Sequence, residues 1–158
     1  MSQLNANPPI AMKKVFDLRD ELRANPRRVE KTQALTLDQA KPHMGLRGTY
    51  GLFASQDWWN NVDSGRMPLL RLAGVVERVY VSGQDEVEAN TVDIRSADGS
   101  LHSVGIYLND GSDLPLFRIG SAVEIVYALD ELKQQPAPDG GVNVSKVALE
   151  MAVSLPPH

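Results

Sequence analysis

Near the N-terminus, apolar and polar positions alternate with the period of a helix. The segment from residue 10 to residue 24 carries apolar side chains at the spacing of one helix face. They are Ala11, Val15, Leu18 and Leu22. Because Pro26 disfavours helical geometry in the residue before it, we expect this helix to end near Asn25. Thr36 and Gln39 have the spacing of a capping box, which predicts one further short helix before Pro42.

From about Gly48 onward the period changes to two, which is typical of strands. A short strand-like run at 50–54 and a helical turn at 56–62 come first. The longer strands are then expected at residues 69–81, 90–96, 101–108, 122–129 and 144–155. Gly74 should bend the first of these or give it a bulge. Asp98-Gly99 is a strong hairpin signal between the second and the third.

This order of strands resembles the OB-fold, a partly open five-stranded Greek-key barrel. The resemblance covers residues 69–155 and rests on Gly74, the Asp98-Gly99 turn, Gly120 and the long loop at 130–143. It implies an all-β protein whose open sheet face and loops bind oligonucleotides or oligosaccharides. An SH3-like or split barrel would produce most of the same features.

The charge reverses at the same place as the period. Residues 1–48 carry nine basic and five acidic side chains, whereas residues 49–158 carry seven basic and fifteen acidic ones, within a net charge of −4. We therefore predict an N-terminal helical, basic extension at residues 1–47, with a disordered or extended leader, and an OB-like barrel domain at residues 48–158.

Composition excludes several kinds of chemistry. The chain has no cysteine, so disulfides, thiolate nucleophiles and cysteine-ligated zinc are ruled out. Its three histidines are far apart in sequence, and we expect neither a metal nor another cofactor. No apolar run approaches the roughly 18 residues of a membrane span, and the first residues do not form a signal peptide. A cytoplasmic, bacterial-type protein that is not an enzyme is expected.

Four side chains in the predicted strands favour a ligand-binding face. Tyr80 shares a strand face with Arg78, and Tyr107 lies out of phase with its apolar neighbour Ile106. Arg95, in the first hairpin strand, adds a cation. An aromatic side chain on the opposite phase from apolar neighbours points outward, where it could stack on a base.

The N-terminal part offers two more groups of candidate binding residues. Arg19, Arg23 and Arg27 recur every four residues and would form a basic ridge if one unbroken helix carried them. Such a ridge could contact phosphates, or it could be a solvated face or dock onto the acidic domain. Trp58 and Trp59 could stack on bases or, alternatively, plug the end of the barrel.

A second resemblance concerns the arginine pair and the hairpin. Arg23-x-x-x-Arg27, together with the segment from Asp93 to Gly99, is similar to the motifs with which PilZ domains bind cyclic di-GMP. The spacing from Asp93 to Ser96 is one residue longer than in that motif, and the arginine pair lies far upstream. A nucleotide sensor is therefore the third of the functions considered.

The leading prediction is a non-enzymatic binding module for single-stranded nucleic acid, based on fold-level analogy. Its weakness is that the loops at 82–89 and 130–143 are acidic and would repel a polyanion. The alternative is a protein–protein adaptor or assembly subunit that uses the acidic barrel and the arm helix. In that case the apolar stripe of the arm would be covered by a partner protein or by another copy in a homo-oligomer.

Overall fold

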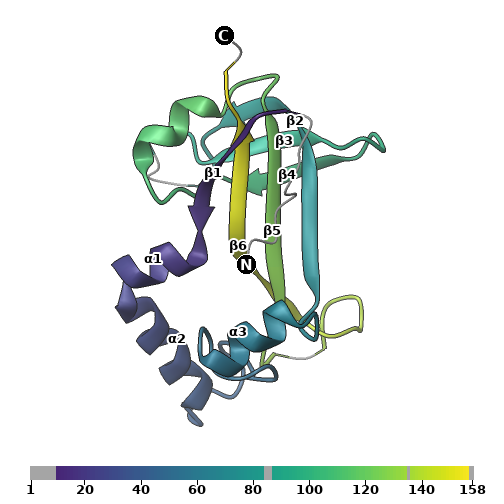
Figure 1. The fold of residues 1–158 in the computed structure, drawn as a ribbon. Coiled ribbons are helices and arrows are strands. Elements are labelled where there is room, and N and C mark those ends of the chain that lie inside the picture. Colours follow the sequence, from purple (N-terminus) through teal and green to yellow (C-terminus); the bar gives the residue numbers. More distant parts are fainter. Residues whose placement is uncertain (1–9, 84–86, 135, 157–158) are drawn as a thin grey trace. The chain divides into compact units, whose positions relative to one another are not determined.

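The computed structural model describes residues 10–83, 87–134 and 136–156, which form helices and one open antiparallel sheet of six strands (Figure 1). The strands are β1 (Met12–Asp17), β2 (Leu69–Tyr80), β3 (Thr91–Arg95), β4 (Leu101–Gly105), β5 (Ala122–Glu131) and β6 (Val144–Ser154). The helices are α1 (Leu18–Ala24), α2 (Pro26–Leu37), α3 (Gln56–Asp63) and the 3-10 helix η1 (Gly111–Leu116). The predicted leader at residues 1–9 lies outside the described residues.

The sheet has the strand order β1-β6-β5-β2-β3-β4, so β1 and β4 are its two edges. The prediction of an all-β, five-stranded OB-like barrel is therefore wrong, because the sheet is open and the fold is mixed α/β. Among the described residues, no helix is long and apolar enough to cross a membrane.

Strand β1 was mistaken for the start of a helix. It pairs with β6 from Met12 opposite Ser154 to Asp17 opposite Glu150, with a register shift between Lys14 and Phe16. The shift lets both Val15 and Phe16 be buried, which breaks the period of two that identifies a strand. Of the other members of the predicted stripe, Leu18 and Leu22 are also buried within the chain and offer a partner no apolar surface, whereas Ala11 is exposed.

Other helical and strand predictions had mixed outcomes. A helix does end at Ala24, but α2 then continues from Pro26 to Leu37 instead of a short helix starting at Thr36. Residues 50–54 form turns, not a strand. The prediction of α3 is confirmed, as are those of β2, β5 and β6 to within about two residues.

The predicted hairpin is confirmed. Strands β3 and β4 pair in register from Thr91 opposite Gly105 to Arg95 opposite Leu101. Gly99 in the connecting turn has a φ of 88°, a left-handed conformation that glycine adopts without a steric penalty.

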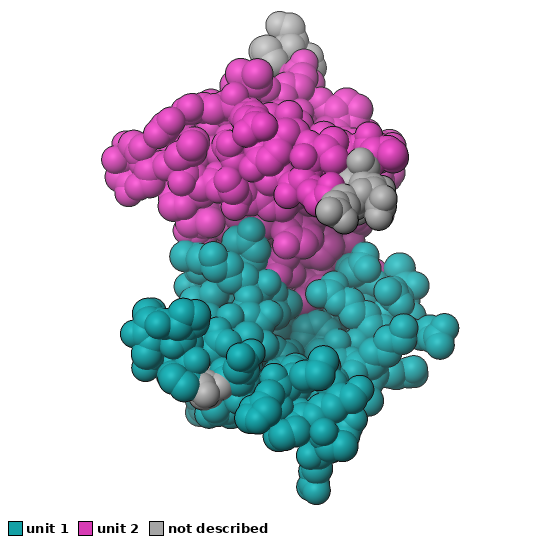
Figure 2. Space-filling view, turned by 180° about the vertical axis from the view of Figure 1, so that it is seen from behind, with its two compact units in different colours: residues 1, 21–70, 127–147 teal, residues 2–20, 71–126, 148–158 magenta. Residues whose placement is uncertain are grey.

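The chain divides into two compact units (Figure 2). Unit 1 comprises residues 1, 21–70 and 127–147, and unit 2 comprises residues 2–20, 71–126 and 148–158. Strands β2, β5 and β6 each contribute residues to both. The proposed division into an arm at residues 1–47 and a domain at residues 48–158 stays a prediction.

Unit 2 contains an apolar core that consists mainly of side chains from the sheet. Its buried side chains include Val76, Val92, Ile94, Val104, Phe117, Val123, Ile125, Met151 and Val153. At the β1 edge, the side-chain amide of Asn109 accepts from the backbone N–H of Asp17 at 2.7 Å and donates to the Asp17 carbonyl at 3.2 Å. These bonds satisfy backbone groups that an edge strand would otherwise present to solvent or to another chain.

Unit 1 is organised around a hydrogen bond between Trp58 and Asp130. The Ser55 side chain caps α3 by accepting from the backbone N–H of Trp58 at 3.3 Å. The Trp58 indole then donates to Asp130 Oδ2 at 2.9 Å, and neither side chain is exposed. Asp130 Oδ1 has no hydrogen-bond partner within the described part of the chain. Burial in these surroundings raises the pKa of Asp130.

The raised pKa of Asp130 predicts a pH-dependent cost in stability. In the folded chain Asp130 keeps its proton to a higher pH than in the unfolded chain. The contribution of Asp130 to the free energy of unfolding therefore falls as the pH rises above the ordinary carboxyl range. We expect Asp130→Asn to gain stability relative to the original protein between about pH 4 and about pH 7, measured by urea denaturation. Asp139→Asn, at an exposed position, is the control. Parallel pH profiles for Asp130→Asn and the original protein would contradict the prediction.

Candidate functional site

Unit 2 presents a continuous outer face on β2, β3 and β4. Paired residues of antiparallel strands share a face, and the register places Arg78 opposite Asp93 and Asp93 opposite Ser103. Val76, Val92, Ile94 and Val104 point the other way, into the core. We call the exposed side of these strands the outer face. It includes Val75, Glu77, Arg78, Tyr80, Thr91, Asp93, Arg95, Leu101 and Ser103.

A hydrogen-bonded network fixes the middle of the outer face. Ser103 Oγ donates to Asp93 Oδ1 at 2.7 Å, and the Tyr80 hydroxyl donates to the same oxygen at 2.9 Å. Both bonds lower the pKa of Asp93, the bond from Ser103 more than the bond from Tyr80, and they favour the ionised carboxylate. The Arg78 guanidinium lies over the Tyr80 ring, 4.1 Å from its centroid. The network therefore holds a cation, an aromatic ring and a carboxylate in one arrangement.

An ion pair extends the outer face toward the hairpin turn. Arg95 donates from Nε and Nη2 to the two carboxylate oxygens of Glu77 at 2.7 and 3.0 Å, and from Nη1 to the carbonyl of Gly99 at 2.9 Å. The bond from Arg95 lowers the pKa of Glu77. A register shift between Val76 and Arg78 puts Glu77 and Arg78, neighbours in sequence, on the same face.

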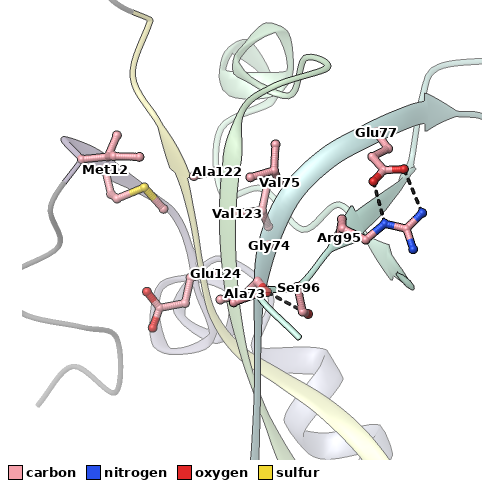
Figure 3. A pocket seen from close by; sticks show the side chains of 12 residues that line it. Met12, Ala73, Gly74, Val75, Glu77, Arg95, Ser96, Ala122, Val123 and Glu124 are labelled. Carbon is pink, nitrogen blue, oxygen red and sulfur yellow. Dashed lines mark hydrogen bonds and ion pairs between the residues drawn. The ribbon is translucent and has the colours of Figure 1, made fainter. Parts of the chain in front are cut away.

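An apolar groove adjoins the outer face and shares Val75, Glu77 and Arg95 with it (Figure 3). Its volume is about 570 Å³. Met12 lies on one side and the Glu77–Arg95 pair on the other, with Val75 and Ala122 between them. Val75 is 48% exposed, and Leu101, the cross-strand partner of Arg95, is 49% exposed. Large aliphatic side chains are thus accessible beside a preformed polar network.

Gly74 makes this arrangement possible. A Cβ atom on Gly74 would lie 2.6 Å from the carbonyl oxygen of Arg95, so no other residue fits without moving the backbone. Next to it, the Ser96 hydroxyl donates to the Ala73 carbonyl at 3.0 Å (Figure 3). The bulge predicted at Gly74 is not there, because the register shift lies between Val76 and Arg78. The absence of a side chain at Gly74 instead allows β2 to approach β3 closely.

Three of the predicted binding residues, Arg78, Tyr80 and Arg95, come together on the outer face. Tyr107 does not join them: its ring contacts the ring of Phe16 at 5.6 Å between centroids. As ligand-binding residues, all four stay predictions.

The remaining predicted residues lie elsewhere. Arg19 and Arg23 are on α1 and Arg27 is on α2, so no unbroken helix carries the proposed ridge. In unit 1, Trp58 is fully buried and packs edge-on against Trp59, which is partly exposed. Their role in ligand binding stays a prediction as well.

Sequence reasoning missed Val75, Leu101 and Ser103 as members of this surface. Counting back from the Asp98-Gly99 turn would have paired Ser103 with Asp93 and Leu101 with Arg95. Val75 gave no signal, because an aliphatic residue in a strand is usually buried. Within the described part of the chain, no three histidine or acidic side chains come together in a way that could hold a metal ion.

Comparison with protein families shows a match over most of the chain. Residues 12–154 match the family described as Immunity protein RhsI2. The chain belongs to this family. Members of an immunity protein family are not enzymes, so the prediction that the chain has no catalytic activity is confirmed. No curated protein shows a significant match.

The family match corrects two predictions. Because the chain belongs to the RhsI2 immunity protein family, its predicted resemblance to the OB-fold superfamily is wrong. A module for single-stranded nucleic acid is also the wrong function, and the alternative reading, binding to another protein, is the better supported one.

Replacing Gly74 tests the geometry of the surface. We expect Gly74→Ala to lower the free energy of unfolding by about 1–3 kcal/mol, because the new methyl group would overlap the Arg95 carbonyl. Gly111→Ala is a matched control, since a Cβ at Gly111 meets no atom within 4 Å. Thermal or urea unfolding of both variants provides the measurement. A Gly74→Ala protein as stable as the Gly111→Ala protein would contradict the assigned role.

Proposed function

We propose that this RhsI2 family member neutralises a cognate Rhs toxin by binding it through the groove and the outer face of unit 2. The observation that carries the proposal is the continuity of the two: Val75, Glu77 and Arg95 belong to both. A partner protein seated there would meet apolar and hydrogen-bonding groups in a single contact. The encounter is expected in the cytoplasm.

The composition of the surface supports a protein partner. Tyrosine and arginine are enriched among the residues that dominate binding energy at protein interfaces, and both stand at the centre of the outer face. Exposed Val75 and Leu101 provide apolar area of the kind found at the middle of such interfaces. An apolar side chain of the toxin would enter the groove, while Arg78 and Asp93 would offer a donor and an acceptor.

Preorganisation favours tight binding. Arg78 is already stacked on Tyr80, whose hydroxyl is already bonded to Asp93. Side chains that are ordered before association lose less conformational entropy when the complex forms. Side chains that are already held in place would therefore contribute to the affinity that neutralisation by binding needs.

The groove is tested by introducing a charge. We expect Val75→Asp to weaken binding of the cognate Rhs toxin by at least about tenfold, because a carboxylate would replace an apolar contact. The matched control is Ile119→Asp, which makes the same kind of change at a side chain that is 76% exposed and does not line the groove. Calorimetric titration and survival of toxin-expressing cells are the readouts. If both variants bind as the original protein does, this groove is not the toxin site.

The outer face is tested by removing its cation. We expect Arg78→Ala to weaken toxin binding by about tenfold or more, since arginine at the centre of an interface is often worth over 1 kcal/mol. Arg118→Ala, an exposed arginine outside the outer face and the groove, serves as the control. An equal, small effect in both variants would place the contact elsewhere on the protein. Thermal unfolding of each variant confirms that it is folded.

A further inference from the structure

Unit 1 contains a second groove, which lies along α2 and has a volume of about 360 Å³. Arg28, Lys31, Thr32 and Leu35 form one wall and, at spacings of three and four residues, share a face of the helix. Leu46 and Phe53, both buried, contribute to the apolar lining. The groove therefore combines cations with an apolar surface.

Helix α2 is attached to unit 1 by polar contacts and by half-buried side chains such as Leu35, which lies against Gly45. None of its twelve residues is buried, although a helix of a globular protein usually buries one face. Lys133 Nζ donates to the carbonyls of Leu35, Asp38 and Lys41 at 2.6, 3.3 and 3.2 Å, which caps the C-terminal end of the helix. Gln33 Nε2 donates to the carbonyl of Phe53 at 2.9 Å. These contacts hold the helix in place and leave its groove side partly uncovered.

The cations of the groove have no ionic partner among the described residues of the chain. Arg28 lies over the ring of Phe53 at 5.7 Å, and neither Arg28 nor Lys31 forms an ion pair with any residue that the structure describes. The first turn of α2 also contains no acidic residue. Basic side chains near the start of a helix are unfavourable there, and a nearby anion would relieve this cost.

We propose that the α2 groove binds an acidic segment of the toxin in which a carboxylate side chain is next to an apolar one. The inference rests on the proposed function and adds a second contact of defined chemistry. The carboxylate would pair with Arg28 and Lys31, and the apolar neighbour would pack on the half-buried Leu35. Charge complementarity and an uncovered helix face both favour this occupant.

An acidic protein segment fits the groove better than a nucleic acid does. A polyanion is held by a track of several cations along its backbone, whereas this groove offers two cations beside aliphatic side chains. The apolar lining would remain without a partner beneath a phosphate backbone. A peptide segment with one acidic and one apolar side chain satisfies both parts of the site.

Charge reversal tests the proposal. We expect Arg28→Glu with Lys31→Glu to weaken binding of the cognate toxin by at least about tenfold at low salt, and by less as the salt concentration rises. The control is Lys41→Glu with Arg66→Glu, which changes the net charge equally at exposed positions of unit 1 outside the groove. Both proteins are first shown to unfold at the temperature of the original.

The outcomes separate the two proposals. Binding by the original protein that is lost only in the groove variant supports the inference. Binding that is equally strong in the groove and control variants overturns it and leaves the proposed function standing. If the original protein does not bind the toxin at all, the proposed function itself fails.

A zero-length cross-link gives a second, direct readout. A carbodiimide joins the amine of Lys31 to a carboxylate in contact with it, and mass spectrometry of the toxin complex identifies the linked residue. We expect Lys31 to be joined to an aspartate or glutamate of the toxin, and Lys41 not to be. A complex in which Lys31 remains unlinked, or in which a single-stranded oligonucleotide displaces the toxin from Lys31, would overturn the assignment.

Discussion

The close approach of β2 to β3 at Gly74 determines the candidate surface of unit 2. Without a side chain at this position, β2 runs within reach of the Arg95 carbonyl, and Val75 pairs with Arg95 directly afterwards. The register shift that follows turns both Glu77 and Arg78 outward, where they meet Arg95 and Tyr80. A steric constraint at one residue thus positions the apolar groove and the polar network together.

The two parts of this surface contribute to recognition in different ways. The Glu77–Arg95 pair is exposed and already satisfied in the free protein, so it adds little net affinity but restricts which partners fit. The exposed area of Val75, in contrast, gains free energy whenever it is removed from water. Affinity is therefore expected from the groove, and selectivity from the charged groups around it.

The sequence predicted those elements whose local pattern agrees with their packing. Strands β2, β5 and β6 are long, and the hairpin has a specific turn sequence. Strand β1, in contrast, contains a register shift that makes its apolar positions resemble those of a helix. Helix α2 was not predicted, because its sequence has no clear apolar stripe. Long-range contacts such as the hydrogen bond from Lys133 to Leu35 hold this helix in place. The alternation of side chains along the strand predicted that Arg78 and Tyr80 share a face. The ligand of that face was inferred from fold analogy to be a nucleic acid, and this inference was wrong.

The two grooves differ in whether their charged side chains are already paired, and this difference bears on specificity. In unit 2 the carboxylate of Glu77, which lines the groove, is already paired with Arg95, whereas in unit 1 Arg28 and Lys31 line the groove without an ion pair to any described residue. An acidic toxin segment would gain ion pairs in the unit 1 groove, whereas in the unit 2 groove it would meet the Glu77 carboxylate and an Arg95 that is already paired. Only a partner with both kinds of segment can use both surfaces. An immunity protein built in this way would discriminate its cognate toxin from related ones by repulsion as well as by attraction.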